Sequence, residues 1–333
     1  MRILFQLNPY LQQRQKEKSR WIYPIKLAMY ATYLRNQGHE IVWDRKYSGF
    51  YDKVINRENQ IDVPFLRLPH ADRILTDAFN PKWQNNGNFK YLPGTYIQSS
   101  NTCWYKKCSF CKETIDNKPY EVRNPQDVSS ELWECYHQGY KEIFDDAATW
   151  NSEDRHWWWE MVNKIGFLYK RTGMRFSCNY RMVDDHYKYM KVCGFRMLLF
   201  GLESANQATL DRINKGRKVE DVRYIIKAAE AGLEPHISVI FGWEWETDAD
   251  ALNTLKLVHW LLRKGYAKTA QASFIVQQGI KGNESQRHFI RDIYGVWKYP
   301  DFWFNKIKDI KDVDDLKYLW LKMKVGLNAL STH

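Results

Sequence analysis

Long apolar runs are absent from the sequence, and no stretch approaches the roughly 20 residues that a membrane-spanning helix needs. The first residues also lack the basic segment, apolar stretch and small-residue cleavage site of a secretion signal. We therefore expect a cytoplasmic protein without a transmembrane segment. Blocks of five or more basic residues are absent too, although the formal charge is +11. The scattered basic residues indicate a mildly basic surface, and they leave an anionic substrate, a nucleic acid and peripheral contact with an anionic membrane open.

Cysteine is scarce as well, with 6 residues among 333, which is too few for a disulfide scaffold and typical of a reducing compartment. Three of the six stand within nine residues, in the spacing C-x4-C-x2-C: Cys103, Cys108 and Cys111. The others fall in regular segments, where burial explains them: Cys135, Cys178 and Cys193. The clustered three predict a metal centre that lacks a fourth protein ligand.

Aromatic side chains are plentiful, with 15 Trp and 21 Tyr. Such residues serve stacking, apolar substrates and membrane interfaces alike, so they do not select a partner. Hydrophobic residues make up 44% and charged residues 27% of the chain, near the averages for globular proteins. We expect a folded chain of one large or two modest domains.

The N-terminal residues have the pattern of one βαβ unit. Strands are predicted at Ile3–Leu7 and Ile41–Trp43, with a helix over Pro24–Gln37 between them. Prolines and an Asn-rich stretch then predict loops up to Pro93, with one more strand at Asp62–Leu68. A complete doubly wound domain needs roughly 120 residues. Residues 1–93 therefore predict a short, incomplete doubly wound α/β domain.

From Gly94 onward, predicted strands and helices alternate. Six strands are predicted, at Thr95–Ser99, Lys141–Asp145, Arg175–Asn179, Arg196–Phe200, His236–Phe241 and Thr269–Val276. Six successive strand–helix units indicate a parallel sheet, whereas a complete eight-unit barrel takes about 250 residues. We predict an α/β fold with a partial (β/α)6 TIM-like barrel over residues 94–276. Residues 277–333 are predicted to form an aromatic and basic C-terminal extension that is partly helical.

Local signals predict where several of these helices begin. Asn124 is predicted to cap one helix, with Pro125 at its first position. Ser204 and Gln207 predict a capping box at the start of another. Within Trp157–Trp159, the first two side chains are predicted to pack inward and the third to project outward.

The carboxyl ends of parallel strands form the active-site edge of such a barrel. The predicted strands end in polar or glycine residues, which are the candidate site residues: Asp145 and Asp146, Asn179 and Arg181, Glu203 and Ser204, Gly242 and Glu244, and Gln277. Three thiolates at this edge suit two kinds of centre. Zinc would need a fourth ligand, such as His137, His156 or His186, none at finger spacing. An iron–sulfur cubane would keep one iron open to a substrate or cofactor, and we favour it.

The cysteine loop resembles that of the radical S-adenosylmethionine (radical SAM) enzymes, which follows the first strand of a partial (β/α)6 barrel. Cys103, Cys108, Phe110 and Cys111 match their motif, with one residue more in the first gap than the usual C-x3-C-x2-C. Further segments resemble the subgroup with an N-terminal cobalamin-binding-like domain, to which residues 1–93 would correspond in truncated form. These segments are Asn8–Pro9, Tyr23–Pro24, Leu34–Glu40, Phe144–Asp146, Cys178–Arg181, Phe200–Ser204, Arg212–Gly216, Ser238–Gly242 and Glu246–Thr247.

The resemblance implies that the three clustered cysteines ligate a 4Fe-4S cluster, whose open iron binds the amino and carboxylate groups of S-adenosylmethionine. Reductive cleavage would give methionine and a 5′-deoxyadenosyl radical, which abstracts hydrogen from a substrate carbon. Glu203 and Arg181 are foremost among the implied cofactor contacts, which are Phe110, Asp145, Asp146, Asn179, Arg181, Glu203, Ser204 and Gly242. No catalytic acid or base is assigned.

The implied partners are an electron donor, such as flavodoxin or ferredoxin, and a small-molecule, lipid-like or peptide substrate that is methylated or rearranged. The cobalamin signature Asp-x-His-x-x-Gly is absent and the N-terminal domain is short, so cobalamin is not favoured. Two alternatives stay open. One is an RNA-modifying enzyme of the same superfamily, suggested by the charge, and the other is a zinc-stabilised, non-catalytic binding protein.

Overall fold

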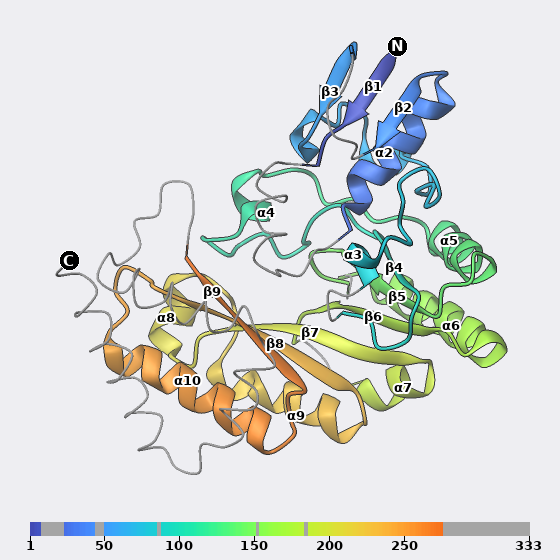
Figure 1. Cartoon of the computed structure of the whole chain (residues 1–333). Helices are drawn as coiled ribbons and strands as arrows, with labels where there is room; N and C mark the ends of the chain where they lie inside the picture. Colours follow the sequence, from blue (N-terminus) through green and yellow to red (C-terminus); the bar gives the residue numbers. More distant parts are fainter. Residues whose placement is uncertain (8–22, 44–49, 85–87, 151–152, 183–185, 276–333) are drawn as a thin grey trace. The chain divides into compact units, whose positions relative to one another are not determined.

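A computed structural model describes residues 1–7, 23–43, 50–84, 88–150, 153–182 and 186–275 of the chain (Figure 1). The predicted C-terminal extension and Gln277 lie outside these residues. The chain divides into two compact units. Unit 1 comprises Met1–Cys103 and Pro119–Cys178, and unit 2 comprises Trp104–Lys118 and the residues from Asn179 onward. The division at residues 93 and 94 that the sequence pattern suggests stays a prediction.

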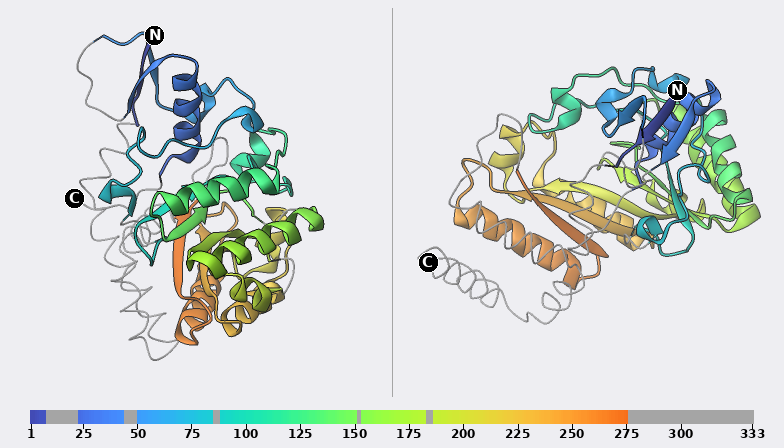
Figure 2. Two further views of the ribbon diagram at one scale, coloured as in Figure 1. Left: turned by 90° about the vertical axis from the view of Figure 1, so that its right-hand side faces the viewer. Right: turned by 45° about the horizontal axis from the view of Figure 1, so that its top comes forward.

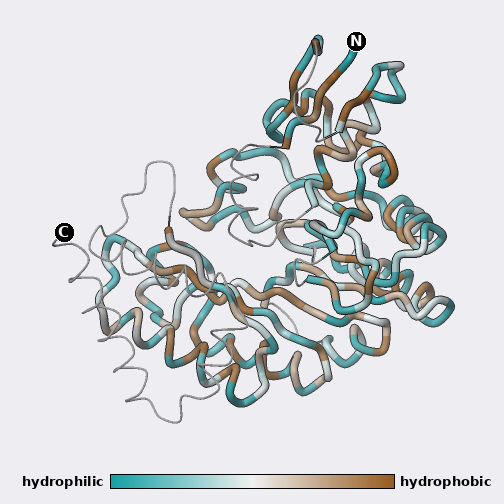
Figure 3. Tube along the Cα trace, in the orientation of Figure 1, coloured by the Kyte–Doolittle hydropathy of each residue, from teal (hydrophilic) through white to brown (hydrophobic). Residues whose placement is uncertain are grey.

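The N-terminal part of unit 1 is a small parallel sheet with the order β2-β1-β3. Its elements are β1 (Arg2–Phe5), α2 (Ile25–Asn36), β2 (Glu40–Trp43) and β3 (Lys53–Ile55). The apolar residues of β1, brown in Figure 3, are fully buried, which fits a central strand. The predicted βαβ unit is thus confirmed.

The strand predicted at Asp62–Leu68 is wrong, because the structure has a single 3-10 turn, Phe65–Arg67, in its place. Pro64 directly precedes this turn and has no N–H to donate to a neighbouring strand. The third strand of the N-terminal sheet is instead Lys53–Ile55, too short to be recognised by its alternation.

The main sheet has six strands in sequential order, β4-β5-β6-β7-β8-β9. They are β4 (Gly94–Ile97), β5 (Glu142–Asp145), β6 (Arg175–Tyr180), β7 (Phe195–Glu203), β8 (Glu234–Phe241) and β9 (Thr269–Phe274). The pairs within each unit are parallel. The α/β fold with six parallel strands is therefore confirmed, as a partial (β/α)6 arrangement requires.

Helices alternate with these strands. They are α3 (Pro81–Gln84), α4 (Lys112–Ile115), α5 (Pro125–His137), α6 (Arg155–Thr172), α7 (Tyr187–Val192), α8 (Gln207–Arg212), α9 (Val222–Glu230) and α10 (Asp248–Arg263). Among the described residues, none of the helices combines the length and apolar character that crossing a membrane requires.

In unit 1, α5 and α6 lie side by side (Figures 1 and 2). The Asn124 side chain accepts a hydrogen bond from the N–H of Gln126, as predicted for a cap before Pro125. The burial of α6 also follows the prediction. Trp157 and Trp158 are buried, whereas Trp159 is 39% exposed, so one face of α6 covers the sheet.

In unit 2, the capping box predicted at Ser204 and Gln207 does not form. The residue before α8 is Asn206, and no side chain caps the first turn of α8. Ser204 is fully buried, and its Oγ instead accepts a hydrogen bond from the N–H of Asn206, at 3.1 Å. Because β7 extends through Glu203, Ser204 belongs to the strand end and not to the helix.

Candidate functional site

The three clustered cysteines occupy the loop after β4. All three are free thiols, with Cys108 buried and Cys103 and Cys111 half-buried. Cys111 directly precedes α4 and its N–H donates to the carbonyl of Cys108, at 3.1 Å. In the part of the chain that the structure describes, no group of three or more His, Cys, Asp and Glu side chains is gathered to hold a single metal ion.

Within unit 2, this loop lies in an apolar cluster. Cys108 and Phe110 pack with residues of α8 and of the loop after β8, and Cys111 contacts the cluster from its edge. The other members are Leu210, Ile213, Trp243 and Ile275, with Tyr105, Val219, Ile240 and Trp245 at the margin. The Phe110 ring meets Trp243 edge to face, with 5.5 Å between the ring centroids. The side chains around these two cysteines are therefore mostly apolar.

Two hydrogen bonds attach the cysteine loop to the turn after α8. The N–H of Ser109 donates to the carbonyl of Ile213, at 3.0 Å, and the Tyr105 hydroxyl donates to the carbonyl of Asn214, at 3.2 Å. Lys106, within the first gap, has a left-handed backbone with φ of 45°. For a non-glycine residue this conformation costs roughly 1 kcal/mol. The backbone of the long first gap is therefore strained at Lys106.

Arg181, predicted to contact the cofactor, is held against this loop. Its guanidinium lies 3.6 Å from the centroid of the Tyr105 ring and donates to the carbonyl of Lys215, at 2.6 Å. It is 8% exposed. A buried guanidinium on an aromatic face is a favourable cation–π contact, so Arg181 supports the loop whatever else it binds.

Glu203, the other foremost candidate, forms an ion pair with Lys215 at 2.6 Å. The two side chains are 8% and 14% exposed. Burial alone would lower the pKa of Lys215, but Glu203 and then Cys108 outweigh it and raise the pKa. The pair lies over Gly201, where an added Cβ would meet the Glu203 carboxylate and stand 2.8 Å from Lys215 Nζ. Glycine at 201 is therefore what leaves room for the pair.

Glu203 also has a left-handed backbone, with φ of 61°, and the register between β7 and β8 shifts between Gly201 and Glu203. Irregularities of this kind redirect a side chain at a strand end. Here the redirected carboxylate meets Lys215.

At the end of β8, the predicted Gly242 contacts a carboxylate that is not among the predicted site residues. The N–H of Gly242 donates to Glu246, at 2.6 Å, and Glu246 is 3% exposed. Burial raises the pKa of Glu246 to about 8 despite that hydrogen bond. Glu244, in contrast, is exposed.

In unit 1, Asp145 at the end of β5 has a clear structural task. Its carboxylate accepts hydrogen bonds from the N–H groups of Ser99 and Ala147, at 3.0 and 3.1 Å. The other oxygen, Oδ2, has no hydrogen-bond partner among the described residues, and burial raises the pKa of Asp145 to about 6. Asp145 thus joins the ends of β4 and β5.

Strand alternation separates Asp145 from its neighbour Asp146. Asp145 pairs in register with Cys178, two residues after Phe176. The Phe176 ring packs on Trp150, which packs on α6 through Trp157. Since residues two apart share one face of a strand, Asp145 faces the α6 side and half-buried Asp146 follows on the other. Their predicted cofactor contacts stay predictions.

Two further candidates have modest local roles. Asn179 is half-buried within β6, one residue after Cys178 and therefore on the opposite face of that strand. Ser204 lies 3.4 Å from the Thr254 hydroxyl of α10, so its polar atom is already engaged within unit 2. Neither observation assigns these residues a ligand.

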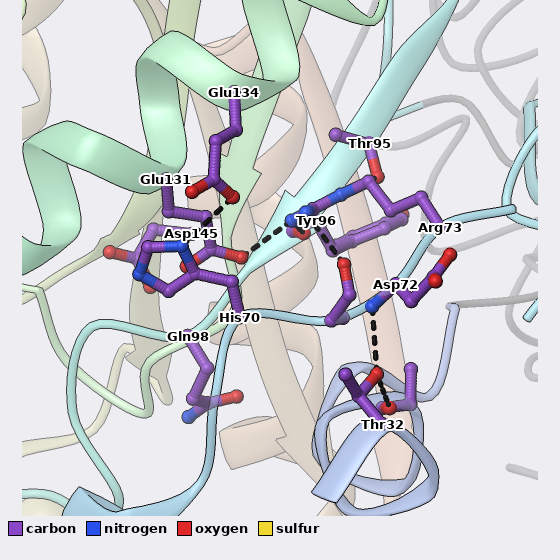
Figure 4. A network of polar contacts seen from close by, with 12 residues as sticks. Thr32, His70, Asp72, Arg73, Thr95, Tyr96, Gln98, Glu131, Glu134 and Asp145 are labelled. Carbon is purple, nitrogen blue, oxygen red and sulfur yellow. Dashed lines mark hydrogen bonds and ion pairs between the residues drawn. The ribbon is translucent and has the colours of Figure 1, made fainter. Parts of the chain in front are cut away.

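A buried polar network supports β4 in unit 1 (Figure 4). Glu131 of α5 pairs through its two oxygens with Arg73, at 2.6 Å, and with Arg123, at 2.5 Å. Both guanidiniums also donate to carbonyls of the chain leading to the cysteine loop, Arg73 to Tyr96 and Arg123 to Gln98. Burial alone would raise the pKa of Glu131, but the two arginines hold it at about 2.

The match with known families covers this same region. Residues 97–258 match the family model described as the Radical SAM superfamily. This part of the chain belongs to that superfamily. The cofactors of that superfamily are a 4Fe-4S cluster and S-adenosylmethionine. The alternative of a zinc-stabilised, non-catalytic protein is not retained.

Solved structures offer weaker likenesses. TsrM, a radical S-adenosylmethionine methyltransferase from Kitasatospora setae, is 18% identical, with a TM-score of 0.45 over 54% of this chain and 36% of its own. Methylornithine synthase (PylB) is 12% identical, with a TM-score of 0.46 over 60% and 61%. The HemN oxidase from Escherichia coli is 14% identical, with a TM-score of 0.40 over 58% and 46%.

The chain thus spans about a third of the length of TsrM and less than two thirds of methylornithine synthase. No curated protein sequence matches the chain. The family assignment depends on the match at residues 97–258 and not on these structures.

The donor set fits the family's cluster, because the loop offers three free thiols and thiolates are the usual ligands of iron–sulfur centres. Sequence reasoning did not select Tyr105, Lys215 and Glu246, which surround the loop and the strand ends of unit 2. Lys215 and Glu246 could have been noticed, since both stand in segments that resemble the family. Tyr105 could not, because its partner lies 109 residues away.

Proposed function

We propose that this protein generates a 5′-deoxyadenosyl radical from S-adenosylmethionine and uses it to abstract hydrogen from a carbon atom of its substrate. The substrate is a small-molecule, lipid-like or peptide compound. The observation that carries the proposal is the loop of three free cysteines after β4, inside the region that matches the superfamily. A flavodoxin or ferredoxin is the proposed electron donor.

Cys103, Cys108 and Cys111 are the proposed cluster ligands. The cluster, when bound, supplies the electron that cleaves S-adenosylmethionine and one iron that accepts its amino and carboxylate groups. The apolar side chains around Cys108 and Phe110 keep water from this part of the loop. Exclusion of water matters because a carbon radical must meet its substrate before any other hydrogen donor.

The proposed cofactor contacts differ in how free they are to move toward a ligand. Arg181 and Glu203 already have partners in Tyr105 and Lys215, so binding S-adenosylmethionine would share or replace these contacts. The N–H of Gly242 already donates a hydrogen bond to Glu246. We therefore propose Glu203 as the first residue to test, because its carboxylate is the acceptor that a cofactor amino or ribose hydroxyl group needs.

We favour chemistry without cobalamin. The described N-terminal sheet has three strands, and the histidine signature for cobalamin is absent from the sequence. The structures of TsrM and of the enzyme OxsB are described with cobalamin bound, so this point calls for a direct test. Absorption of corrin in protein purified from cells supplied with cobalamin would reverse our preference.

The products formed from S-adenosylmethionine test the proposal. Protein reconstituted anaerobically with iron and sulfide, then reduced, is expected to yield 5′-deoxyadenosine. The Cys108→Ala variant should lose this activity and Cys135→Ala should keep it, since Cys135 is buried in α5. S-adenosylhomocysteine beside 5′-deoxyadenosine would indicate methyl transfer. Unchanged cleavage in Cys108→Ala would reject the proposal.

A further inference from the structure

The first gap of the cysteine motif is the part of the site in which this chain departs from its family. It holds Trp104, Tyr105, Lys106 and Lys107, one residue more than the usual three. An extra residue lets the loop adopt more conformations, which would have to be lost when a cluster binds. Something must therefore order this gap, and the left-handed backbone of Lys106 shows that it is held in one strained conformation.

Tyr105 makes the contacts that can do so. Its hydroxyl donates to the carbonyl of Asn214, while the face of its ring carries the guanidinium of Arg181 at 3.6 Å. Arg181 in turn donates to the carbonyl of Lys215, the next residue in the same turn. The phenol and the guanidinium thus bind two successive carbonyls and each other, which makes a closed set of contacts within unit 2.

Gly216 leaves the space that the ring of Tyr105 occupies. Its φ is 60°, and an added Cβ would meet the Tyr105 hydroxyl and stand 2.7 Å from Cζ. A side chain at position 216 would therefore displace the phenol, and glycine avoids this clash. Only a tyrosine offers both the hydroxyl that reaches Asn214 and the ring that supports Arg181.

We infer that Tyr105 is a positioning residue, which seats the long first gap of the cysteine loop on the turn Asn214–Gly216 before any cofactor binds. The role given to Tyr105, which is to present Cys108 and Cys111 in an ordered loop, rests on the proposed function. The inference does not depend on that function for its evidence, because the contacts exist in the chain alone. Lower conformational freedom in the free protein means that less order has to be gained when the cluster enters.

Trypsin cleavage of the cofactor-free protein tests directly whether the Tyr105 contacts order the first gap, because Lys106 and the exposed Lys107 lie in it. Tyr105→Ala and Gly216→Ala should each raise the cleavage rate at these lysines by about tenfold, as expected for losing contacts of this kind. Each rate is divided by that of a synthetic 101–112 peptide carrying the same sequence. The double variant should be cleaved little faster than Tyr105→Ala, since both changes break one contact.

Gly265→Ala is the matched control. Gly265 also has a positive φ, of 76°, but no atom lies within 4 Å of an added Cβ there. It carries the backbone strain of the substitution without the contact, and its rate should stay within about twofold of the wild type. Equal rates for Gly216→Ala and Gly265→Ala, or an unchanged rate in Tyr105→Ala, would overturn the inference.

Cluster loading gives a second readout. Tyr105→Phe keeps the ring and loses the hydroxyl, so its iron and sulfide content after limited reconstitution should fall between wild type and Tyr105→Ala. If wild-type protein takes up no iron and sulfide, the proposed function fails while the cleavage experiment still decides the inference. If Tyr105→Ala reaches the wild-type iron and sulfide content, the contacts of Tyr105 have no part in cluster binding and the inference fails.

Discussion

Unit 1 and unit 2 both bury charged side chains, but they place them in opposite electrostatic situations. In unit 1, Glu131 lies between two guanidiniums, and its pKa is held at about 2. In unit 2, Glu246 accepts a hydrogen bond from the N–H of Gly242, and burial raises its pKa to about 8. The first arrangement stabilises a fixed charge, whereas the second keeps a carboxyl group whose charge changes near neutral pH.

The strands show the same contrast. All residues of β4 and β5 in unit 1 are buried, so both faces of those strands are covered. Along β8 in unit 2, buried and half-buried residues alternate, and the half-buried face carries His236 and Ser238. Both faces of β4 and β5 are therefore covered in unit 1, whereas one face of β8 in unit 2 leaves its polar side chains partly exposed. Three substitutions would break or sharpen this comparison.

The largest effect is expected in unit 1. Glu131→Ala removes the carboxylate that both Arg73 and Arg123 contact, and it leaves two buried guanidiniums without their shared partner. We expect the free energy of unfolding to fall by about 4 kcal/mol, measured by urea denaturation of the cofactor-free protein. Glu134→Ala, whose side chain is 51% exposed, is the control and should cost less than about 1 kcal/mol. Similar losses in both variants would contradict the comparison.

A smaller loss is expected in unit 2 from Lys215→Met, which leaves the Glu203 carboxylate without its cation. We expect about 2 kcal/mol by the same measurement, because Glu203 loses one cation, whereas Glu131 is paired with two. Adding Glu203→Gln should recover most of that loss, since it removes the uncompensated charge. No recovery in the double variant would mean that Lys215 acts through packing alone.

The third expected effect is a pH dependence, which is the smallest of the three when counted per pH unit. The pKa of Glu246 is raised in the folded protein, so its contribution to stability is present below about pH 4.5 and is lost as pH rises through about 8. Compared with Glu246→Gln, the wild type should lose up to about 1.4 kcal/mol per pH unit between pH 5 and 7. Parallel stability curves for the two proteins would show that Glu246 does not titrate in this range.

Features that depend on neighbours in sequence were predictable. The cap at Asn124, the proline after it and the inward packing of Trp157 and Trp158 follow from spacing within one or two turns of helix. The six strands and the cysteine loop were predicted for the same reason, since each is a local pattern. The capping box at Ser204 failed because tertiary contact with Thr254 competes for that hydroxyl.

The partners of the site residues were not predictable in this way. Glu203 and Lys215 are 12 residues apart, Arg181 and the carbonyl of Lys215 are 34 apart, and Tyr105 and Asn214 are 109 apart. These contacts depend on how strand ends and turns meet in the folded unit. Spacing indicated which residues would carry chemistry, but not which of them would support each other.

The iron and acid-labile sulfide content of anaerobically reconstituted protein tests the central claim most directly. We predict about four of each per chain, with a sharp loss in each single alanine variant of Cys103, Cys108 and Cys111 and none in Cys135→Ala. Zinc without sulfide, or iron and sulfide retained in all three variants, would contradict the account.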